Sequence, residues 1–291
     1  MALTRIDHVM ICVPDLPQGI DTYRRIGFDV HLGGVHTGRG THNAIASVEN
    51  DYLELMAVRD RDEYAAKNPT GGLLEFLAKG GGFRFVAVQS DDVAADAAAM
   101  RSRVVDVSEP VESGRRTPAG LELRWKAAFL GPRNPLPVFF IQHLNSVDER
   151  RKQVASRAHP NGAQRIDRVY INVDDVGAAA DMYSRVLGIA KPNIQRGAVI
   201  KADMAVFNLG PTGLTVAQPA EPGPSAEAMA RRGPGPFQVL YRTSGMDAAA
   251  RWMGDHGMPP PMRGIRNTGE QAMLVTPEHA CGAYIGFVGP A

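Results

Sequence analysis

The chain repeats one of its own segments at a distance of 160 residues. Residues 5–15 read RIDHVMICVPD and residues 165–175 read RIDRVYINVDD, with the same Arg-Ile-Asp start and the same spacing of valines. A repeat at a fixed offset indicates a duplicated structural unit, and 291 residues exceed the usual size of a single core. The sequence therefore predicts two similar halves, with His8 of the first replaced by Arg168 in the second.

Each copy opens a series of one strand, one helix and three strands. The apolar run at 6–13 predicts a strand, and apolar residues at helical spacing over 15–28 predict a helix that ends near Gly27. Three short strand-like runs follow, and two weaker units place a strand before an Ala-rich helix. The sequence thus predicts an α+β fold of four βαβββ modules, at residues 4–58, 80–143, 165–218 and 236–288.

Composition indicates where the modules join. A polar, basic stretch at 144–164 is predicted to link an N-terminal domain, 1–143, to a C-terminal domain, 165–291. The Pro- and Gly-rich stretch at 218–236 is predicted to be a loop between the third and fourth modules. Each domain would then hold two modules.

Charge and composition argue against several classes of protein. The formal net charge of +1 argues against a nucleic-acid-binding surface, and no apolar run reaches the roughly 20 residues that cross a bilayer. Two cysteines are too few for a disulfide framework, and the first residues lack the order of a signal peptide, so a cytoplasmic location is expected. The expected partner is a small-molecule substrate, with a homodimer as an open alternative.

The modules and their polar residues resemble a known superfamily. Repeated βαβββ modules with His in the first strand and Glu in the fourth are similar to the vicinal oxygen chelate superfamily, which includes glyoxalase I, extradiol dioxygenases and methylmalonyl-CoA epimerase. The stretches GRGTHNAIASVENDYLELMAV and LELRWKAAFLG resemble its glyoxalase-like domain proteins. The resemblance implies modules paired into two half-barrels, here called cups, with helices outside and a divalent metal at the floor of a cup.

Three side chains of the first module are candidate metal ligands under this resemblance. Because side chains alternate along a strand, His8 and Glu54 are predicted to face the cup from adjacent strands, about 5 Å apart. His42 is predicted to face the same cup, on the assumption that Ile45 faces the helices. Two histidines and a carboxylate suit Zn, Mn, Fe or Ni without distinguishing them. Glu54 and His42 are also the candidate catalytic groups that move a proton.

Each candidate ligand has a structural alternative. His8 could be a hydrogen-bonded structural residue, and His42 could be a turn residue or a substrate contact. Glu54 could be an exposed charge, but its apolar neighbours make the strand apolar on both faces, where a carboxylate needs a partner.

Candidate substrate contacts come from the second module and from one loop. Gln142 is assigned to the position that matches Glu54, where it could contact substrate or be a hydrogen-bonded core amide. Arg39, in a Gly-rich loop, could bind an anionic group, with a solvated surface position as the alternative. Arg124 is a further candidate, on the opposite face of its strand from Trp125, which is predicted to belong to the core.

The second half lacks a comparable ligand set. Its ligand positions read Arg168, Thr215 or Val216, a residue near Val239, and Gly286, so its cup is predicted to hold no metal. Two functions fit the sequence. One is a metal-dependent lyase, isomerase or dioxygenase that acts on a small oxygen-chelating substrate in the N-terminal cup. The other is a non-catalytic protein that sequesters a small molecule.

Overall fold

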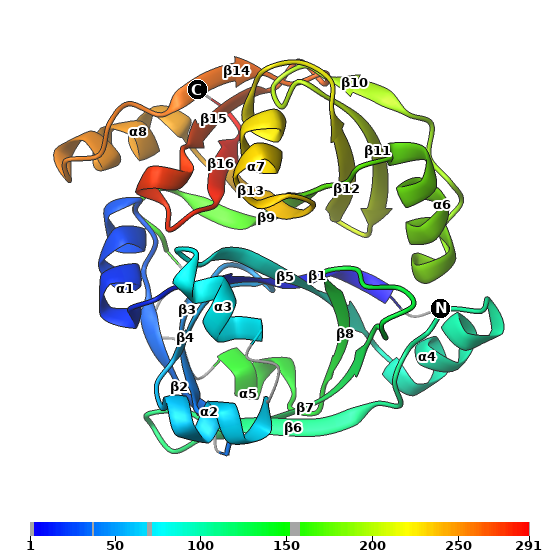
Figure 1. Ribbon diagram of the computed structural model, residues 1–291. Coiled ribbons are helices and arrows are strands. Elements are labelled where there is room, and N and C mark those ends of the chain that lie inside the picture. Colours follow the sequence, from blue (N-terminus) through cyan, green and yellow to red (C-terminus); the bar gives the residue numbers. More distant parts are fainter. Residues whose placement is uncertain (1–2, 37, 69–71, 152–157, 291) are drawn as a thin grey trace.

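The computed structural model describes residues 3–36, 38–68, 72–151 and 158–290, and Figure 1 shows its two halves, each built on an eight-stranded sheet. The strands of the first half are β1 (Leu3–Cys12), β2 (His31–His36), β3 (Thr41–Ser47), β4 (Tyr52–Val58), β5 (Gly82–Ser90), β6 (Val111–Arg116), β7 (Glu122–Phe129) and β8 (Val138–His143). Those of the second are β9 (Ala163–Asn172), β10 (Gln195–Gly197), β11 (Ala202–Leu209), β12 (Thr212–Pro219), β13 (Gly235–Thr243), β14 (Met262–Ile265), β15 (Gln271–Val275) and β16 (Tyr284–Val288). The helices are α1 (Leu16–Arg25), α2 (Arg61–Lys67), α3 (Gly72–Ala78), α4 (Val93–Ser102), α5 (Val147–Arg151), α6 (Val176–Leu187), α7 (Pro224–Arg232), α8 (Met246–Asp255) and the short η1 (Pro277–His279).

The predicted fold class is confirmed. Each module is a strand, an outer helix (α1, α4, α6 or α8) and three further strands. In both sheets the fourth strand of a module lies between its first and third strands, as in β1-β4-β3-β2. The first strands of paired modules, β1 with β5 and β9 with β13, run antiparallel and join the modules into one sheet.

The two halves differ in closure. The strands of the first half form a closed barrel, because Val35 at the edge of its first module pairs with Arg116 at the edge of its second. The second half is an open sheet with β10 and β14 at its edges. The pairing of Val35 with Arg116 closes the half-barrel of the first half, whereas that of the second half stays open.

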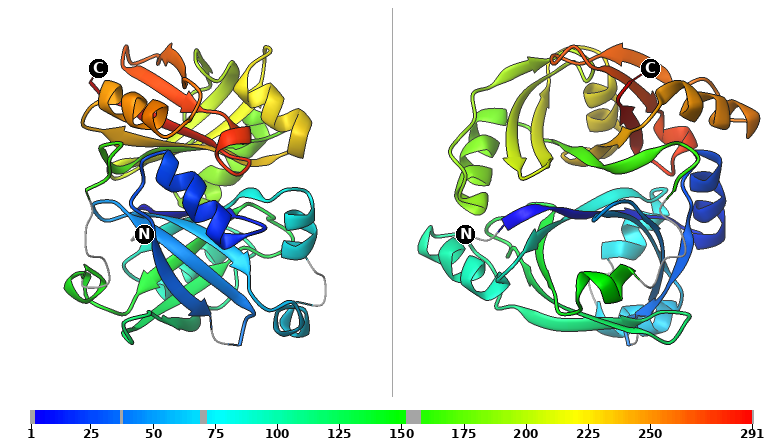
Figure 2. Two further views of the ribbon diagram at one scale, coloured as in Figure 1. Left: turned by 90° about the vertical axis from the view of Figure 1, so that its left-hand side faces the viewer. Right: turned by 180° about the vertical axis from the view of Figure 1, so that it is seen from behind.

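Several helices outside the modules close the ends of the sheets. In the first half, α2 and α3 lie at one end of the barrel and α5 at the other (Figures 1 and 2). Helix α5 occupies the start of the predicted linker, and residues 152–157 of that linker lie outside the described residues. The prediction of a loop over 218–236 is wrong for the middle of this stretch, which forms α7. Pro224 begins this helix, in the first turn, where proline is tolerated. None of the helices in the described ranges combines the length and apolar character needed to span a bilayer.

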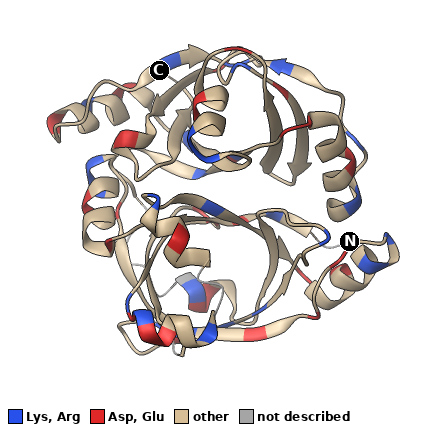
Figure 3. Cartoon of the chain, viewed as in Figure 1, with Lys and Arg blue, Asp and Glu red and all other residues tan. Residues whose placement is uncertain are grey.

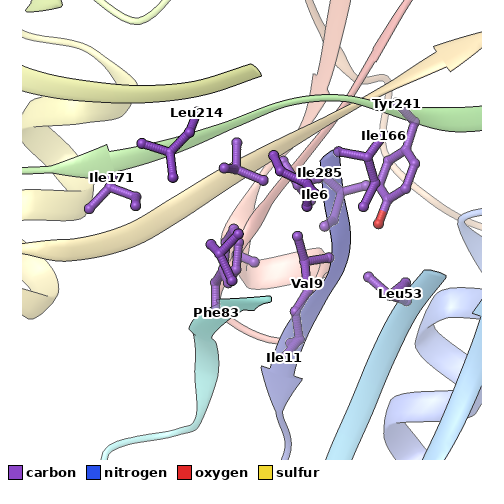
Figure 4. Close-up of a cluster of buried hydrophobic side chains, with 14 of the residues drawn as sticks. Ile6, Val9, Ile11, Leu53, Phe83, Ile166, Ile171, Leu214, Tyr241 and Ile285 are labelled. Carbon is purple, nitrogen blue, oxygen red and sulfur yellow. The ribbon is translucent and has the colours of Figure 1, made fainter. Parts of the chain in front are cut away.

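One hydrophobic core joins the halves. Figure 4 shows Ile6 and Val9 of β1 beside Ile166 of β9 and Ile285 of β16, and all four are fully buried. The side chains that line the inside of each sheet belong to separate clusters. Each cup therefore lies on the far side of its sheet from the shared core.

Three register shifts occur at matching positions of both halves, and two of them lie next to the candidate ligand positions. Asp7 on β1 and Arg84 on β5 each lie at a shift of register between these strands. Asp167 on β9 and Phe237 on β13 lie at the corresponding shifts in the second half. A bulge inserts one residue into a strand and changes the direction of its side chain. These four residues therefore do not follow the simple alternation used to assign faces from the sequence.

Candidate functional site

A cavity of about 780 Å³ lies inside the first barrel, in the size range of small-molecule sites. The strands of the first module line it with polar side chains, including His8, His36, Asn43 and Glu54. The strands of the second module contribute mainly apolar side chains, such as Phe139. Helices α2 and α3 border the cavity at one end. The cavity thus has one polar wall and one apolar wall.

His8 is held at the polar wall by contacts on several sides of its ring. Its Nδ1 lies 2.7 Å from Oδ1 of Asp7. The ring stacks on Tyr52 with centroids 4.3 Å apart, and the ring of Phe139 meets it edge-on at 5.6 Å. Its Nε2 lies 3.5 Å from Oε2 of Glu54. Asp7 therefore fixes one ring nitrogen, and the other faces Glu54 and the cavity.

Asp7 is fully buried and contacts a second histidine. Its Oδ2 lies 2.7 Å from Nε2 of His143 on β8. Burial alone would raise the pKa of Asp7, but the charges and hydrogen bonds of His143 and His8 outweigh burial and hold this pKa well below its usual range. Because an ionised carboxylate only accepts hydrogen bonds, Nδ1 of His8 is the donor. A carboxylate in this position orients many metal-ligating histidines.

Glu54 is buried on β4 and has neighbours from β3 and β2. Nδ2 of Asn43 donates to its Oε1 at 2.7 Å, and Nε2 of His36 lies 4.0 Å from the same oxygen. Nδ1 of His36 lies 2.9 Å from the hydroxyl of Thr41, which leaves Nε2 on the Glu54 side. Burial lowers the pKa of His36, and nearby arginines lower it further although Glu54 opposes them, so this ring is neutral at neutral pH.

These side chains have the donor chemistry of a divalent-metal site. Imidazole nitrogens and a carboxylate suit Zn, Mn, Fe or Ni. Across the described residues, no three His, Cys, Asp or Glu side chains already stand as a complete ligand set. His8 and Glu54 already lie next to each other at the cavity, and Nε2 of His36 lies 4.0 Å from Oε1 of Glu54. The donor chemistry therefore fits a divalent metal, which His8 and Glu54 would hold, with His36 as the next nearest donor.

The structure places His8 and Glu54 on the cavity face, as predicted, but the predicted orientation of His42 is wrong. Asn43 lines the cavity in its place, and Ala44 packs in the shared core. The prediction took Ile45 as facing the helices, whereas Ile45 lines a smaller pocket near the α5 end of the barrel. Because this strand is buried on both faces and carries apolar residues on each, its alternation gave no reliable choice of face.

The assignment of Gln142 to the cavity is also wrong. Its Nε2 donates to the carbonyl of Asp91 at 2.8 Å, and its Oε1 accepts from the backbone of Val93 at 3.3 Å. These bonds hold the start of α4, which corresponds to the structural alternative. The strand register places Phe139, not Gln142, at the position that matches Glu54.

The remaining predicted contacts divide between the cavity and the surface. Arg39 lines the cavity, whereas Arg124 is exposed and forms an ion pair with Glu112 outside it. Trp125, predicted to be a core residue, lines the cavity. Sequence reasoning missed Asp7 in this site, although its retention in both copies of the repeat was an available signal.

Sequence reasoning also missed Asn43, His36 and His143. Asn43 and His36 contact or approach Glu54, and His143 contacts Asp7. These three residues depend on strand registers that the sequence does not fix.

The corresponding surface of the second half is filled. Arg168 takes the place of His8 and Thr215 the place of Glu54, in the same strand register. Tyr170, Phe237 and Tyr284 form an apolar cluster with residues of α7. Ser225 of α7 also exchanges hydrogen bonds with Asn172, at 2.6 Å and 2.8 Å. Figure 3 shows acidic and basic residues interspersed over both halves.

Family comparison agrees with this architecture. The family described as Glyoxalase-like domain matches residues 6–187, well over half of the chain. The chain belongs to the glyoxalase-like family. A second description, Glyoxalase/Bleomycin resistance protein/Dioxygenase superfamily, matches residues 167–275 of this glyoxalase-like protein. Both halves thus carry the vicinal oxygen chelate fold.

Solved structures show the same fold at low sequence identity. A hypothetical protein from Staphylococcus aureus is 15% identical, with a TM-score of 0.68 over 99% of this chain and 100% of that one. A mutant of 4-hydroxymandelate synthase from Streptomyces coelicolor is 13% identical, with a TM-score of 0.67 over 100% of this chain and 94% of that one. Among curated proteins, none matches the glyoxalase-like protein described here.

Proposed function

We propose that the first barrel is the active site of a divalent-metal-dependent enzyme, a lyase, isomerase or dioxygenase, for a small substrate with two neighbouring oxygen donors. The observation that carries the proposal is the pair formed by His8 Nε2 and Glu54 Oε2, 3.5 Å apart in the cavity. The shared fold with 4-hydroxymandelate synthase, an enzyme, supports the assignment.

The distance and polarity of this pair favour a metal between the two groups. A separation of 3.5 Å is long for a hydrogen bond, but it suits two ligands that each lie about 2.0 to 2.2 Å from one ion. When His8 is neutral, its Nε2 presents a lone pair to a carboxylate, and two acceptors in contact repel. A cation between them removes that repulsion. A protonated His8 would instead make a structural ion pair, which the experiment below distinguishes.

The surrounding residues have separable roles. A bound divalent metal supplies Lewis-acid stabilisation of negative charge on the substrate oxygens. Asp7 and Tyr52 fix the His8 ring, and Asn43 fixes one oxygen of Glu54. His36, neutral at neutral pH, takes the role first assigned to His42, as third ligand or as acceptor of a substrate proton.

Metal analysis of the purified protein tests the proposal. We expect protein prepared without chelator to hold a divalent metal, and His8→Ala and Glu54→Gln to lose most of it while remaining folded. His42→Ala is the matched control, because it removes a histidine of β3 that does not line the cavity. Wild-type protein that takes up none of Zn, Mn, Fe(II) or Ni would contradict the proposal.

The size and apolar wall of the cavity favour a second candidate, a non-catalytic protein that sequesters a small molecule. Metal content, ligand affinity and melting temperature separate the two candidate functions. A binding protein of this kind would retain ligand affinity without metal, and His8→Ala and Glu54→Gln would lower the melting temperature without loss of a metal.

A further inference from the structure

The charge of the cavity is unbalanced. Arg39, Lys67, Arg84 and Arg115 line it, and Glu54 is the sole carboxylate among its described lining residues. Within the described part of the chain, Arg39, Lys67 and Arg84 form no ion pair. A divalent metal would make the cavity still more positive. Away from Glu54, a cavity with this balance of charge attracts an anionic ligand.

Arg84 is directed to the cavity by one of the β-bulges. It is the residue without a partner in the β1–β5 register, between Phe83 and Phe85. Its guanidinium carbon lies 4.8 Å from the ring centroid of Phe76 on α3 and 5.3 Å from that of Phe85. Stacking on these rings orients the guanidinium without neutralising its charge. Arg84 is therefore positioned and free of a carboxylate partner.

An arginine of the second half packs on the same phenylalanine ring as Arg84. Arg232, at the end of α7, also stacks on Phe76, with its guanidinium carbon 5.2 Å from the ring centroid. The residue of the second half that matches Arg84 at the bulge is Phe237, which packs in the apolar cluster. The cation at this bulge is thus specific to the half that contains the cavity.

The wall opposite the polar residues is apolar and rich in rings. Phe85, Phe139 and Phe129 line it, and the last two stack with centroids 5.4 Å apart. Such a surface gains free energy when it covers an apolar group and gains none from a hydrated one. A ligand that satisfies the whole cavity therefore combines an anionic group with an apolar body.

We infer that the substrate is an organic carboxylate with an apolar, ring-bearing body, and that Arg84 is the residue that binds its carboxylate. A carboxylate is favoured because the planar guanidinium binds it through two parallel hydrogen bonds. As a statement about substrate, this inference rests on the proposed function. As a statement about binding, it does not require the metal.

Binding of matched neutral and charged probes to chelator-treated protein tests the inference. Calorimetric titration would compare 2-naphthoate with 2-naphthamide, which share a body and differ in charge. We expect the carboxylate to bind at least about tenfold more tightly, because hydrogen bonds between two charged groups are stronger than those to a neutral amide. Arg84→Met should abolish this preference. Arg124→Met, which removes an exposed arginine outside the cavity, should leave it unchanged.

The outcomes also separate this inference from the proposed function. Equal binding of the two probes, no binding of either, or an unchanged preference in Arg84→Met would overturn it. Tighter binding of 2-naphthyl phosphate than of 2-naphthoate would overturn the assignment of a carboxylate. A carboxylate preference in a protein that takes up no metal would uphold the inference and remove the metalloenzyme proposal.

Discussion

The two halves of this protein share a backbone plan and differ in what lies inside it. Both contain the same strand order and the same bulges, two of which bear on the site. In the first half the bulges carry Asp7 and Arg84, beside a cavity. In the second they carry Asp167 and Phe237, beside an apolar cluster. The comparison shows that bulge positions belong to the fold, whereas the residues at them determine the site.

The retained aspartates show this difference most clearly. Asp7 contacts His8 and His143 at 2.7 Å each and is fully buried. Asp167 accepts hydrogen bonds from Arg242 at 2.7 Å and Arg266 at 3.1 Å. Histidine can be neutral and bind a metal, but arginine keeps its charge. The same carboxylate thus orients a candidate ligand in one half and anchors permanent cations in the other.

The largest expected effect concerns the core that both halves share. Ile6→Ala and Ile166→Ala should each lower the free energy of unfolding by about 2 to 5 kcal/mol, because each leaves a cavity in one common core. The two tryptophans lie in different halves: Trp125 is on β7, and Trp252 is on α8, where its indole also donates to the carbonyl of Arg24. Fluorescence of Trp125→Phe and Trp252→Phe backgrounds should give coincident unfolding transitions. Separate transitions would show that the halves are independent domains.

A smaller difference is expected between the paired aspartates. Asp7→Ala leaves two histidines without their acceptor inside the barrel and should cost about 3 kcal/mol. Asp167→Ala should cost about 1 kcal/mol, because Arg242 and Arg266 retain their ion pairs with Glu270. Denaturant unfolding measures both. Equal costs would mean that the loss of the acceptor for His8 and His143 does not destabilise the protein more than the loss of Asp167.

The sequence predicted the fold well because its signals were redundant. The repeat, the strand alternation around Val9 and the helix spacing before Gly27 all indicated the same module. His8 and Glu54 were placed correctly because Val9 and Leu53 beside them are clearly core residues. Local patterns of this kind fix which way a side chain faces.

The sequence could not predict contacts that depend on register or on closure. His42 was misplaced because β3 is buried on both faces and carries apolar residues on each. Gln142 was misplaced because the end of β8 was aligned with the wrong residue of β4. Barrel closure depends on the pairing of Val35 with Arg116, which lie far apart in the sequence. His36 approaches Glu54 only once these strands are arranged in the barrel.

A further prediction concerns the contact between the two copies of the repeat. Asp51 forms an ion pair with Arg5 of the first copy and accepts from the backbone of Ile166 in the second at 3.1 Å. Burial raises the pKa of Asp51 to about 6, against the opposing effect of Arg5. Because the folded state then holds this proton more tightly than the unfolded state, stability is lost as pH rises from about 4 to about 6.

Asp51→Asn isolates this term, because it cannot ionise. The difference in unfolding free energy between wild type and Asp51→Asn should fall by about 2 kcal/mol between pH 4 and pH 6.5. Asp181→Asn removes an exposed carboxylate paired with Lys191 and serves as the control, with a flat difference expected. A flat profile for Asp51→Asn as well would mean that folding does not raise the pKa of Asp51.

The smallest expected effect tests which histidine replaced the predicted one. His36→Ala removes a neutral ring whose Nε2 lies 4.0 Å from Glu54, and we expect metal affinity to fall about tenfold, or about 1.4 kcal/mol, as for a weak or supporting ligand. His42→Ala removes a histidine of β3 that does not line the cavity and should leave affinity unchanged. Competition with a chromophoric chelator measures both constants. If His42→Ala lost affinity and His36→Ala did not, β3 would have to carry the register first inferred from the sequence. The first half would then bind metal through a different set of strands from the one described here.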